Sequence, residues 1–366
     1  MILLHVFHDV WQYIYSIFRK DATMQKILPI ANPIITHSPP VAYLSSILGN
    51  NPATYSWLMN HYVNIYVHNG GYFDNFYDRC MFYHGCPWLQ VVQIRREIVL
   101  NICNKITDYV KTLLEQDFYV YALANVQYIE AYGRDQYYGH NFLIYGYDDD
   151  KQEFLIADFF NRGRYGTARC SYDKIEMALQ TAHMEKDFVN LIYGVKLKNI
   201  DYTFEINMLS EMLKEHIEST NLFYKYNTCP EEEYYSNKSG NDYHYFGFEE
   251  MKTLYSFGLS FYDQLNNMII SKPLKVLRPI DLIYEHKIMM EHRVDYLMEN
   301  RYISEKSYLK LKEKIEFLRK SSLLTRNLYL KHLMRPEREL INKIPDQIEE
   351  LKMLDQDFSI SLLNAL

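Results

Sequence analysis

The spacing of apolar residues changes near residue 200, and this change limits the possible folds more than any other feature of the chain. Before it, short runs rich in β-branched and aromatic residues alternate with helical stretches. After it, apolar residues recur almost only at helical spacing. The 366 residues, 48% of them hydrophobic, suffice for two domains. We therefore predict an α+β fold, with an antiparallel-sheet domain over residues 25–200 and a helical domain over residues 201–366.

The first of these domains is expected to contain at least four strands, each bounded by turn or polar residues. The candidate strands cover residues 118–123, 141–147, 153–157 and 188–197. An Asp-rich connection over residues 147–152 joins two of them and is typical of a hairpin turn. A single long helix is expected over residues 91–115, and an inter-helix loop over residues 75–89.

The second domain is expected to consist of helices. Apolar stripes at helical spacing cover residues 204–223, 248–270, 282–299, 304–334 and 337–354. The polar, turn-rich stretch 227–242 is expected to be a loop or a disordered connector. Glu285, His286 and Arg293 lie on one predicted helix at seven- and eight-residue spacing, which indicates a solvated or inter-helix polar patch.

Charge and composition limit the partners. The chain has 39 basic and 46 acidic residues, so it lacks the basic footprint of a nucleic-acid-binding protein. Apolar residues at four-residue spacing predict an amphipathic helix over residues 1–24 rather than a signal peptide. Elsewhere no uncharged apolar run approaches the ~18 residues of a membrane span. We expect a cytoplasmic protein that binds neither nucleic acid nor membranes.

Cofactor motifs are missing from the sequence. Five cysteines at wide spacing, without a CxxC pair, argue against both a disulfide framework and a zinc finger. There is no GxGxxG or P-loop motif for a nucleotide. We therefore expect no metal and no cofactor.

The segment from Gly139 to Asp158 is the most informative for chemistry. His140 opens one predicted strand, a Gly146-Tyr147-Asp148 turn follows, and Asp158 closes the next strand. Adjacent antiparallel strands would bring the imidazole and the carboxylate to one sheet edge, within hydrogen-bond reach. There the carboxylate can hold the ring tautomer and stabilise the protonated ring, as in nucleophilic triads. The alternative is a structural histidine followed by an ordinary hairpin.

Residues 115–159 resemble the N-terminal family of butirosin biosynthesis protein H, a bacterial form of the papain-like fold. The matching elements, in order, are a helix ending in Leu113-Leu114-Glu115-Gln116, a strand over residues 119–123, Tyr128-Ile129 with a polar loop, His140, Gly146-Tyr147-Asp148 and Asp158. Tyr245-Phe246-Gly247-Phe248 is similar to the start of the family's helical C-terminal region. The resemblance implies a papain-like N-terminal domain with a Cys–His–Asp site, in which His140 is the general base and Asp158 orients it.

The nucleophile departs from the family pattern. In such folds the Cys lies at the start of the first long helix, where the dipole lowers its pKa. The matching stretch, residues 36–49, has prolines at its helix start and a glycine at its end, and the Cys position falls on Ser38. Ser38 can attack if His140 removes its proton, but it equally suits a helix N-cap. Asn32, six residues upstream, occupies the place of the family's oxyanion-hole amide.

Two cysteines are alternative nucleophiles. Cys80 and Cys86 lie in an aromatic segment, and Arg79 beside Cys80 favours a thiolate. Both also fit the more common role of a buried small hydrophobe. Metal binding by these two thiols and His84 lacks a fourth ligand at a suitable spacing.

The resemblance implies an acyltransferase or amide-bond-forming enzyme of peptide or antibiotic biosynthesis. Its partners would be an acyl or peptidyl carrier protein, which supplies a thioester, and a small amine or peptide, which accepts the acyl group. One alternative is a non-catalytic binding protein on a papain-like scaffold that has lost its Cys. A third possibility is a peptidase or amidase that uses the same site with water as acceptor.

Overall fold

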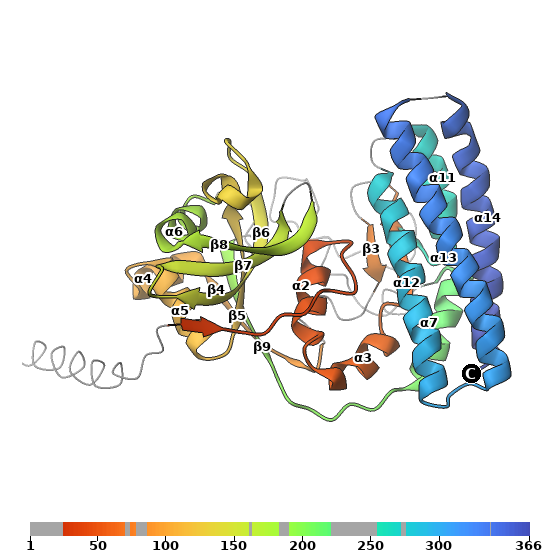
Figure 1. The fold of residues 1–366 in the computed structure, drawn as a ribbon, viewed down its shortest axis with the longest axis horizontal. Coiled ribbons are helices and arrows are strands. Elements are labelled where there is room, and N and C mark those ends of the chain that lie inside the picture. The colour runs from red at the N-terminus through yellow and green to blue at the C-terminus, as the bar shows by residue number, and fades with distance from the viewer. Residues whose placement is uncertain are drawn as a thin grey trace, which may run out of the picture. The chain divides into compact units, whose positions relative to one another are not determined.

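The structure is a computed structural model of the chain (Figure 1). It describes residues 25–69, 74–77, 86–160, 163–182, 190–220, 255–271, 276–336 and 338–366. The helix expected over residues 1–24, the connector 227–242 and Cys80 lie outside these ranges. The fold class is α+β, as expected, with an antiparallel sheet in the N-terminal half and helices in the C-terminal part.

The chain divides into two compact units, and both are discontinuous in sequence. Unit 1 contains Met1–Pro29 and Val91–Lys196, and unit 2 contains Ile30–Gln90 and Leu197–Leu366. The expected boundary near residue 200 falls close to the end of unit 1. The segment Ile30–Gln90, which we expected in the N-terminal domain, belongs instead to the unit that holds the C-terminal helices. Hydrogen bonds account for this, because Thr36 and His37 donate to Glu285, and Arg293 donates to the carbonyl oxygens of Met59 and His61.

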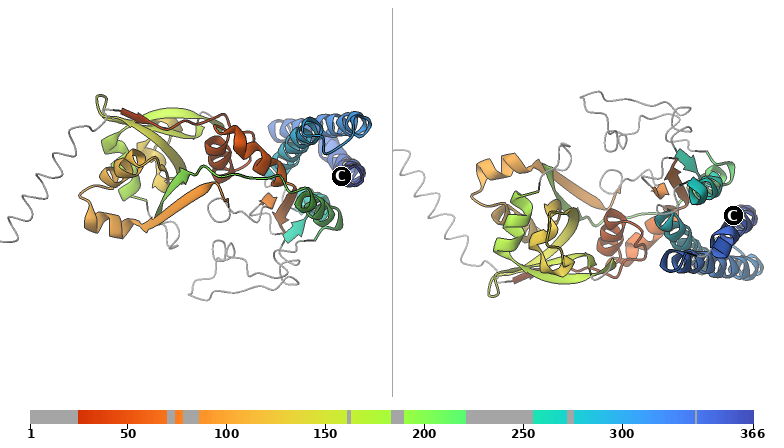
Figure 2. Two further views of the ribbon diagram at one scale, coloured as in Figure 1. Left: turned by 90° about the horizontal axis from the view of Figure 1, so that it is seen from below. Right: turned by 90° about the horizontal axis from the view of Figure 1, so that it is seen from above.

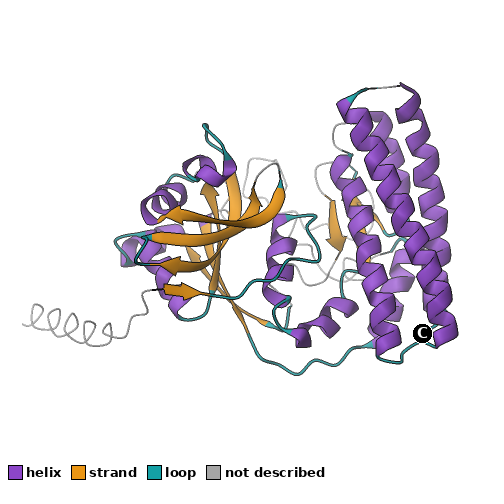
Figure 3. Ribbon diagram, viewed as in Figure 1, coloured by secondary structure: helices purple, strands orange, loops and turns teal. Residues whose placement is uncertain are grey.

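A seven-stranded sheet forms the centre of unit 1 (Figure 3). The strand order is β4-β9-β5-β6-β7-β8, and β1 pairs with β6 beside this path. The strands are β1 (Gln25–Ile27), β4 (Leu89–Arg95), β5 (Tyr119–Asn125), β6 (Gly139–Asp148), β7 (Glu153–Phe160), β8 (Arg164–Ser171) and β9 (Leu191–Leu197). The four expected strands correspond to β5, β6, β7 and β9. Strand β8 was not expected, because it is mostly polar and leaves Arg164, Thr167 and Arg169 exposed.

Gly146 lies inside β6 rather than in a turn, so the predicted Gly-Tyr-Asp turn is wrong. The chain turns over residues 149–152, and Gly146 marks a close approach of β1 to β6. A Cβ atom at Gly146 would lie 2.6 Å from the carbonyl oxygen of Lys26. The β6–β7 register also shifts between Ile144 and Gly146. The glycine therefore serves a strand contact with no room for a side chain.

The α-helices in the described part of unit 1 are α4 (Arg96–Ile102), α5 (Ile106–Glu115) and α6 (Tyr172–Gln180). The single helix expected over residues 91–115 is wrong, because its first part is strand β4 and the remainder is interrupted at Cys103. The backbone of Cys103 is extended, with φ −125° and ψ 145°. The carboxylate of Glu176 then accepts hydrogen bonds from the first amides of α5, Ile106 N at 3.0 Å and Thr107 N at 2.8 Å. This side chain satisfies donors that a helix start leaves open, so a new helix begins there.

Unit 2 combines a small antiparallel sheet with helices. The sheet has the order β10-β2-β3, with β2 (Asn64–His68), β3 (Asp74–Tyr77) and β10 (Tyr255–Phe257). The helices are α2 (Pro39–Leu48), α3 (Tyr55–Asn60), α7 (Ile206–Glu218), α11 (Ser260–Ser271), α12 (Leu277–Glu299), α13 (Glu305–Met334) and α14 (Arg338–Leu363). The five expected helices correspond to α7 and α11–α14. Two expectations need correction, because strand β3 lies in the predicted inter-helix loop and strand β10 in the predicted helix 248–270.

The long helices of unit 2 lie side by side (Figures 1 and 2). The predicted stripe of α13 is buried at Leu311, Ile315 and Leu318, which are 0–2% exposed. Helix α14 buries its own stripe, including Ile348 and Phe358. Each helix thus turns one apolar face into a shared core. Among the described residues, no helix is long and apolar enough to cross a membrane.

Candidate active site

His140 and Asp158 are in contact, as predicted. The Nε2 atom of His140 lies 3.1 Å from the Oδ2 atom of Asp158. The β6–β7 register pairs Leu143 with Ala157, and continuing it places Asp158 opposite Phe142. His140 lies two residues before Phe142 and therefore on the same face of the sheet. The alternation of side chains along two paired strands thus produces the contact.

The two partners differ in exposure. The side chain of Asp158 is fully buried, whereas that of His140 is 25% exposed. With Nε2–H donating to the carboxylate, Nδ1 carries the lone pair of the neutral ring. A buried carboxylate that holds a partly exposed imidazole in one tautomer is the arrangement that a general base requires.

Tyr132 is a third member of the site that the sequence did not indicate. It lies on the short helix η4 (Glu130–Tyr132), after η3 (Val126–Tyr128), and its hydroxyl donates to the same Oδ2 atom of Asp158. Burial raises the pKa of this hydroxyl well above its ordinary value of 10.0, and the charge of Asp158 raises it further. The hydroxyl therefore remains protonated, and a donor, at neutral pH. Nothing in the sequence distinguishes Tyr132 among 35 tyrosines.

Aromatic rings enclose the imidazole of His140. Tyr138 stacks on it with the ring centroids 5.7 Å apart and an interplanar angle of 24°. Tyr132 meets it edge-on at 5.9 Å. The guanidinium of Arg134 lies 4.7 Å from the centre of the Tyr138 ring. These contacts restrict the rotation of the imidazole, and Tyr138, which is 43% exposed, forms part of the surface beside it.

Ser38 lies in unit 2 at the N-cap of α2, where the sequence placed it. Pro39 and Pro40 are the first helical residues, and Gly49 is the C-cap, so the predicted helix boundaries are confirmed. The Oγ atom of Ser38 makes no capping hydrogen bond. It is buried and has no hydrogen-bond partner among the described residues, and the residue is 5% exposed. The hydroxyl thus does not do the work of a cap, and its role as the nucleophile for His140 stays a prediction.

Glu285 fixes the segment that precedes Ser38. Its carboxylate, on α12, accepts hydrogen bonds from the Thr36 N–H at 2.9 Å and the His37 N–H at 2.7 Å. It also accepts one from the Thr36 hydroxyl. Burial raises the pKa of Glu285, although the bonds from Thr36 and the charge of His37 oppose this change. Of the two sequence interpretations, a solvated patch does not describe Glu285, because its carboxylate is bonded to the segment that precedes α2.

The described cysteines do not have the surroundings of a reactive thiolate. Cys86 is buried, with 4% exposed, as its small-hydrophobe interpretation requires. Burial raises the pKa of Cys103, and it raises the pKa of Cys170 to about 11. A nucleophilic thiol needs the opposite shift. Asn32, the predicted oxyanion-hole amide, is exposed in unit 2.

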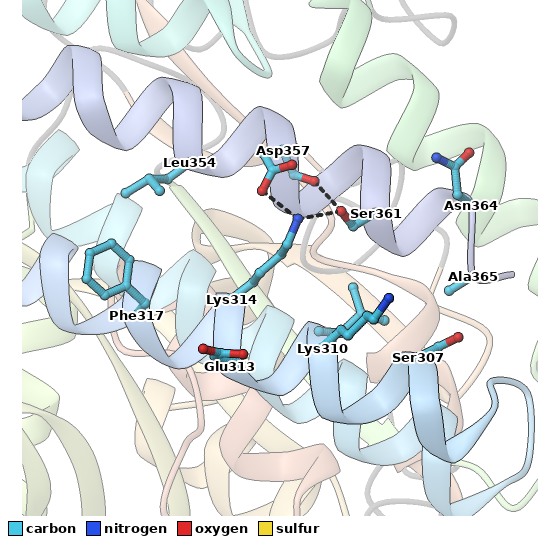
Figure 4. Close-up of a pocket in the computed structure, with 11 residues that line it drawn as sticks. Ser307, Lys310, Glu313, Lys314, Phe317, Leu354, Asp357, Ser361, Asn364 and Ala365 are labelled. Carbon is cyan, nitrogen blue, oxygen red and sulfur yellow. Dashed lines mark hydrogen bonds and ion pairs between the residues drawn. The ribbon is translucent and has the colours of Figure 1, made fainter.

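A pocket of about 630 Å³ lies between α13 and α14 (Figure 4). Its most prominent polar contact is internal, because Lys314 Nζ donates to Asp357 Oδ2 at 2.6 Å and to Ser361 Oγ at 2.9 Å. No member of the His140 site lines it. Its chemistry therefore gives no support for a catalytic site there.

Comparison with known proteins adds no family to this picture: no protein-family model matches the chain, and no curated protein matches its sequence.

Proposed function

We propose that the protein is an acyl-transfer enzyme of peptide or antibiotic biosynthesis, with a papain-like arrangement. It moves an acyl group from a carrier-protein thioester to a small amine or peptide, in the cytoplasm and without a cofactor. The observation that carries the proposal is the 3.1 Å contact between His140 Nε2 and the fully buried Asp158 carboxylate. The papain-like fold and the choice of substrate rest on the sequence resemblance.

The chemistry is nucleophilic acyl substitution in two steps. In the first, Nδ1 of His140 takes the hydroxyl proton of the predicted nucleophile, Ser38, and the oxygen attacks the thioester carbonyl. The carrier thiolate leaves and is protonated by the imidazolium of His140. In the second step the amine attacks the acyl-serine and gives its proton to His140, which returns it to the serine oxygen. Asp158 stabilises the imidazolium in both steps.

Acyl transfer from a loaded carrier protein tests the proposal. A chain incubated with an acyl-loaded carrier should gain the mass of the acyl group, and peptide mapping should place it on Ser38. His140→Ala, Ser38→Ala and Asp158→Asn should each slow the transfer by about 10² or more, the usual effect of losing a general base. The His140→Ala/Ser38→Ala double variant should be no slower than either single variant, because both residues act in one step. Asp150→Asn, at an exposed turn position, is the matched control and should retain the full rate.

Other outcomes reassign the site or the reaction. Full activity of Ser38→Ala together with loss of activity in Cys80→Ala or Cys86→Ala would move the nucleophile to the aromatic segment. Release of the free acid with every amine tested would show that water is the acceptor, and cleavage of an amide substrate by the same site would then identify a peptidase or amidase. Unchanged rates in the His140 and Asp158 variants would overturn the proposal.

The start of α2 favours a second candidate, a non-catalytic binding protein. Pro39 and Pro40 have no N–H groups, and Glu285 already accepts the His37 N–H, so few donors remain to stabilise an oxyanion beside Ser38. A scaffold that has lost its Cys would bind the carrier protein or a peptide without turnover. Calorimetry would then show carrier binding that His140→Ala and Ser38→Ala leave unchanged, together with no acyl transfer by the wild type.

A further inference from the structure

A second polar cluster lies in unit 2, buried between the helices. Its five side chains come from α7, α11, α12 and α14, and each is 0% exposed. They are His216, Tyr262, His286, Lys287 and Asp355. Three donors meet at Oδ2 of Asp355, namely Lys287 Nζ at 2.6 Å, Tyr262 OH at 2.8 Å and His216 Nε2 at 3.1 Å. A buried carboxylate with three donors is well compensated for its loss of water.

Three of these residues are of the types that form a transition-metal site. Ligand atoms of His216, His286 and Asp355 all lie within 4.8 Å of one another. His286 Nε2 lies 2.7 Å from the Val63 carbonyl oxygen and donates to it, which leaves the Nδ1 lone pair directed at the cluster. A backbone carbonyl that orients a histidine in this way is the usual support of a zinc ligand. Two imidazoles and one carboxylate would suit a divalent transition metal.

The ammonium group of Lys287 already occupies the position of such a cation. Lys287 Nζ lies 2.8 Å from His286 Nδ1 and 2.6 Å from Asp355 Oδ2, between two of the three ligand-type groups. Burial lowers the pKa of Lys287, while the charge of Asp355 raises it. Burial also acts to raise the pKa of Asp355, but the charges of Lys287 and His216 outweigh it and hold the pKa well below 3.8. The ammonium and the carboxylate therefore neutralise each other within the helices.

We propose that Lys287 is the built-in cation of this centre: its ammonium lies between His286 and Asp355, where a divalent transition metal would bind with His216 as a further ligand. Unit 2 then holds its buried carboxylate without a metal ion. Removing the ammonium opens the position to Zn²⁺ or Co²⁺. This inference concerns residues outside the proposed active site and does not depend on it.

The wild-type protein provides the first test. Purified full-length chain should contain far less than one metal ion per molecule by elemental mass spectrometry. Its Tm should not change with EDTA or with added Zn²⁺. Stoichiometric metal, or a Tm that falls with EDTA, would overturn the proposal because a metal would then be the resident cation.

The Lys287→Met variant provides the second test, because methionine has an unbranched side chain that is one atom shorter than that of lysine and carries no charge. It should bind one Co²⁺ per chain and develop the visible absorption of tetrahedral Co²⁺. At a hundredfold excess of Zn²⁺ over its Kd, its Tm should rise by about 5–10 °C. A folded variant that binds no Co²⁺ overturns the proposal. If the variant is unfolded without metal, recovery of a cooperative melt with Zn²⁺ supports the proposal, and failure to recover overturns it.

Two controls isolate the cation position. Lys310→Met removes an exposed lysine of α13 and should show no Co²⁺ absorption and no change of Tm with Zn²⁺. The double variant Lys287→Met/Asp355→Asn removes the ammonium and the carboxylate ligand together, and it should lose the metal response of the single variant. A double variant that binds Co²⁺ as tightly as the single variant would show that the metal lies elsewhere and would overturn the assignment.

Discussion

The hydroxyl of Tyr132 and the Nε2 atom of His140 meet at one oxygen of Asp158, so the carboxylate is held from two sides. Tyr132→Phe removes one of these donors and leaves a buried charge with one hydrogen bond fewer. We expect the free energy of unfolding to fall by about 1–3 kcal/mol, measured by urea denaturation. Tyr138→Phe is the matched control, because the ring that stacks on His140 is kept and no bond to Asp158 is lost. Equal stability of both variants would show that the Tyr132 bond contributes nothing measurable.

Lowering the pH should reduce the free energy of unfolding of unit 2, because His286 is buried there. Burial, together with the charge of Lys287, holds the pKa of His286 well below 6.5, and His216 and Asp355 are the other titratable groups beside it. Below pH 6.5 the unfolded chain therefore binds a proton at His286 that the folded chain does not bind. The free energy of unfolding is highest above pH 6.5 and decreases as the pH falls. Between pH 7 and pH 5 we expect a loss of about 2 kcal/mol from this group. Urea titrations at both pH values should show a smaller loss in His286→Gln, and an equal loss would exclude His286 as the source.

At the residue scale, sequence reasoning succeeded where the spacing along two paired strands determines the outcome. His140 and Asp158 could be placed together because a hairpin with period-two side chains leaves few alternatives. Tyr132 could not be found in this way, since it lies on the second of two short 3-10 helices that follow β5, outside any strand pairing. The cluster around Asp355 was missed for a related reason, because its residues come from four helices, α7, α11, α12 and α14, and His216 lies 139 residues before Asp355. Of the two alternatives given for the patch with His286 and Arg293, solvated or inter-helix, the solvated one is excluded, since both side chains are 0% exposed.

Among the elements, β6 can approach β1 closely because Gly146 has no side chain. Gly146→Ala places a Cβ atom 2.6 Å from the backbone oxygen of Lys26, which cannot move without displacing β1. We expect a loss of about 1–3 kcal/mol in the free energy of unfolding, the usual effect of overpacking. Gly166→Ala in β8 is the control, because no atom lies within 4 Å of the added Cβ, and it should change stability by less than about 0.5 kcal/mol. Similar losses in both variants would show that the effect comes from the strand backbone and not from the β1–β6 contact.

The strands and helices were predictable to different degrees for physical reasons. The helices α12–α14 carry long periodic stripes, which local sequence alone determines. The apolar residues in the stretch 91–115 fit both the two-residue period of a strand and the period of a helix. The start of this stretch is a strand, β4, because it pairs with β9. The amide donors that begin α5 are bonded to Glu176 on α6, which no local pattern reveals.

For the whole molecule, the discontinuity of unit 2 predicts that its C-terminal part cannot fold alone. Arg293, which is fully buried, donates to the carbonyl oxygens of Met59 and His61, both of which lie in the earlier segment Ile30–Gln90. A fragment of residues 197–366 should therefore lack a cooperative thermal transition. Fusing residues 30–90 to it through a flexible Gly/Ser linker should restore the transition. A cooperative melt of the fragment by itself would contradict the division described for unit 2.

The interruption of unit 2 by unit 1 also determines the order in which the chain can fold as it leaves the ribosome. The segment Ile30–Gln90, which contains the buried residues Val41–Leu48 of α2, is synthesised long before α7, α11 and α12, which contact its strand β2. At ~5–20 residues per second, the intervening sheet of unit 1 alone delays those helices by several seconds or more. During that interval the sheet of unit 1 can be completed, whereas an apolar segment upstream of it still lacks its partners. We therefore expect the nascent chain to be bound by chaperones from the time α2 emerges until α14 is released.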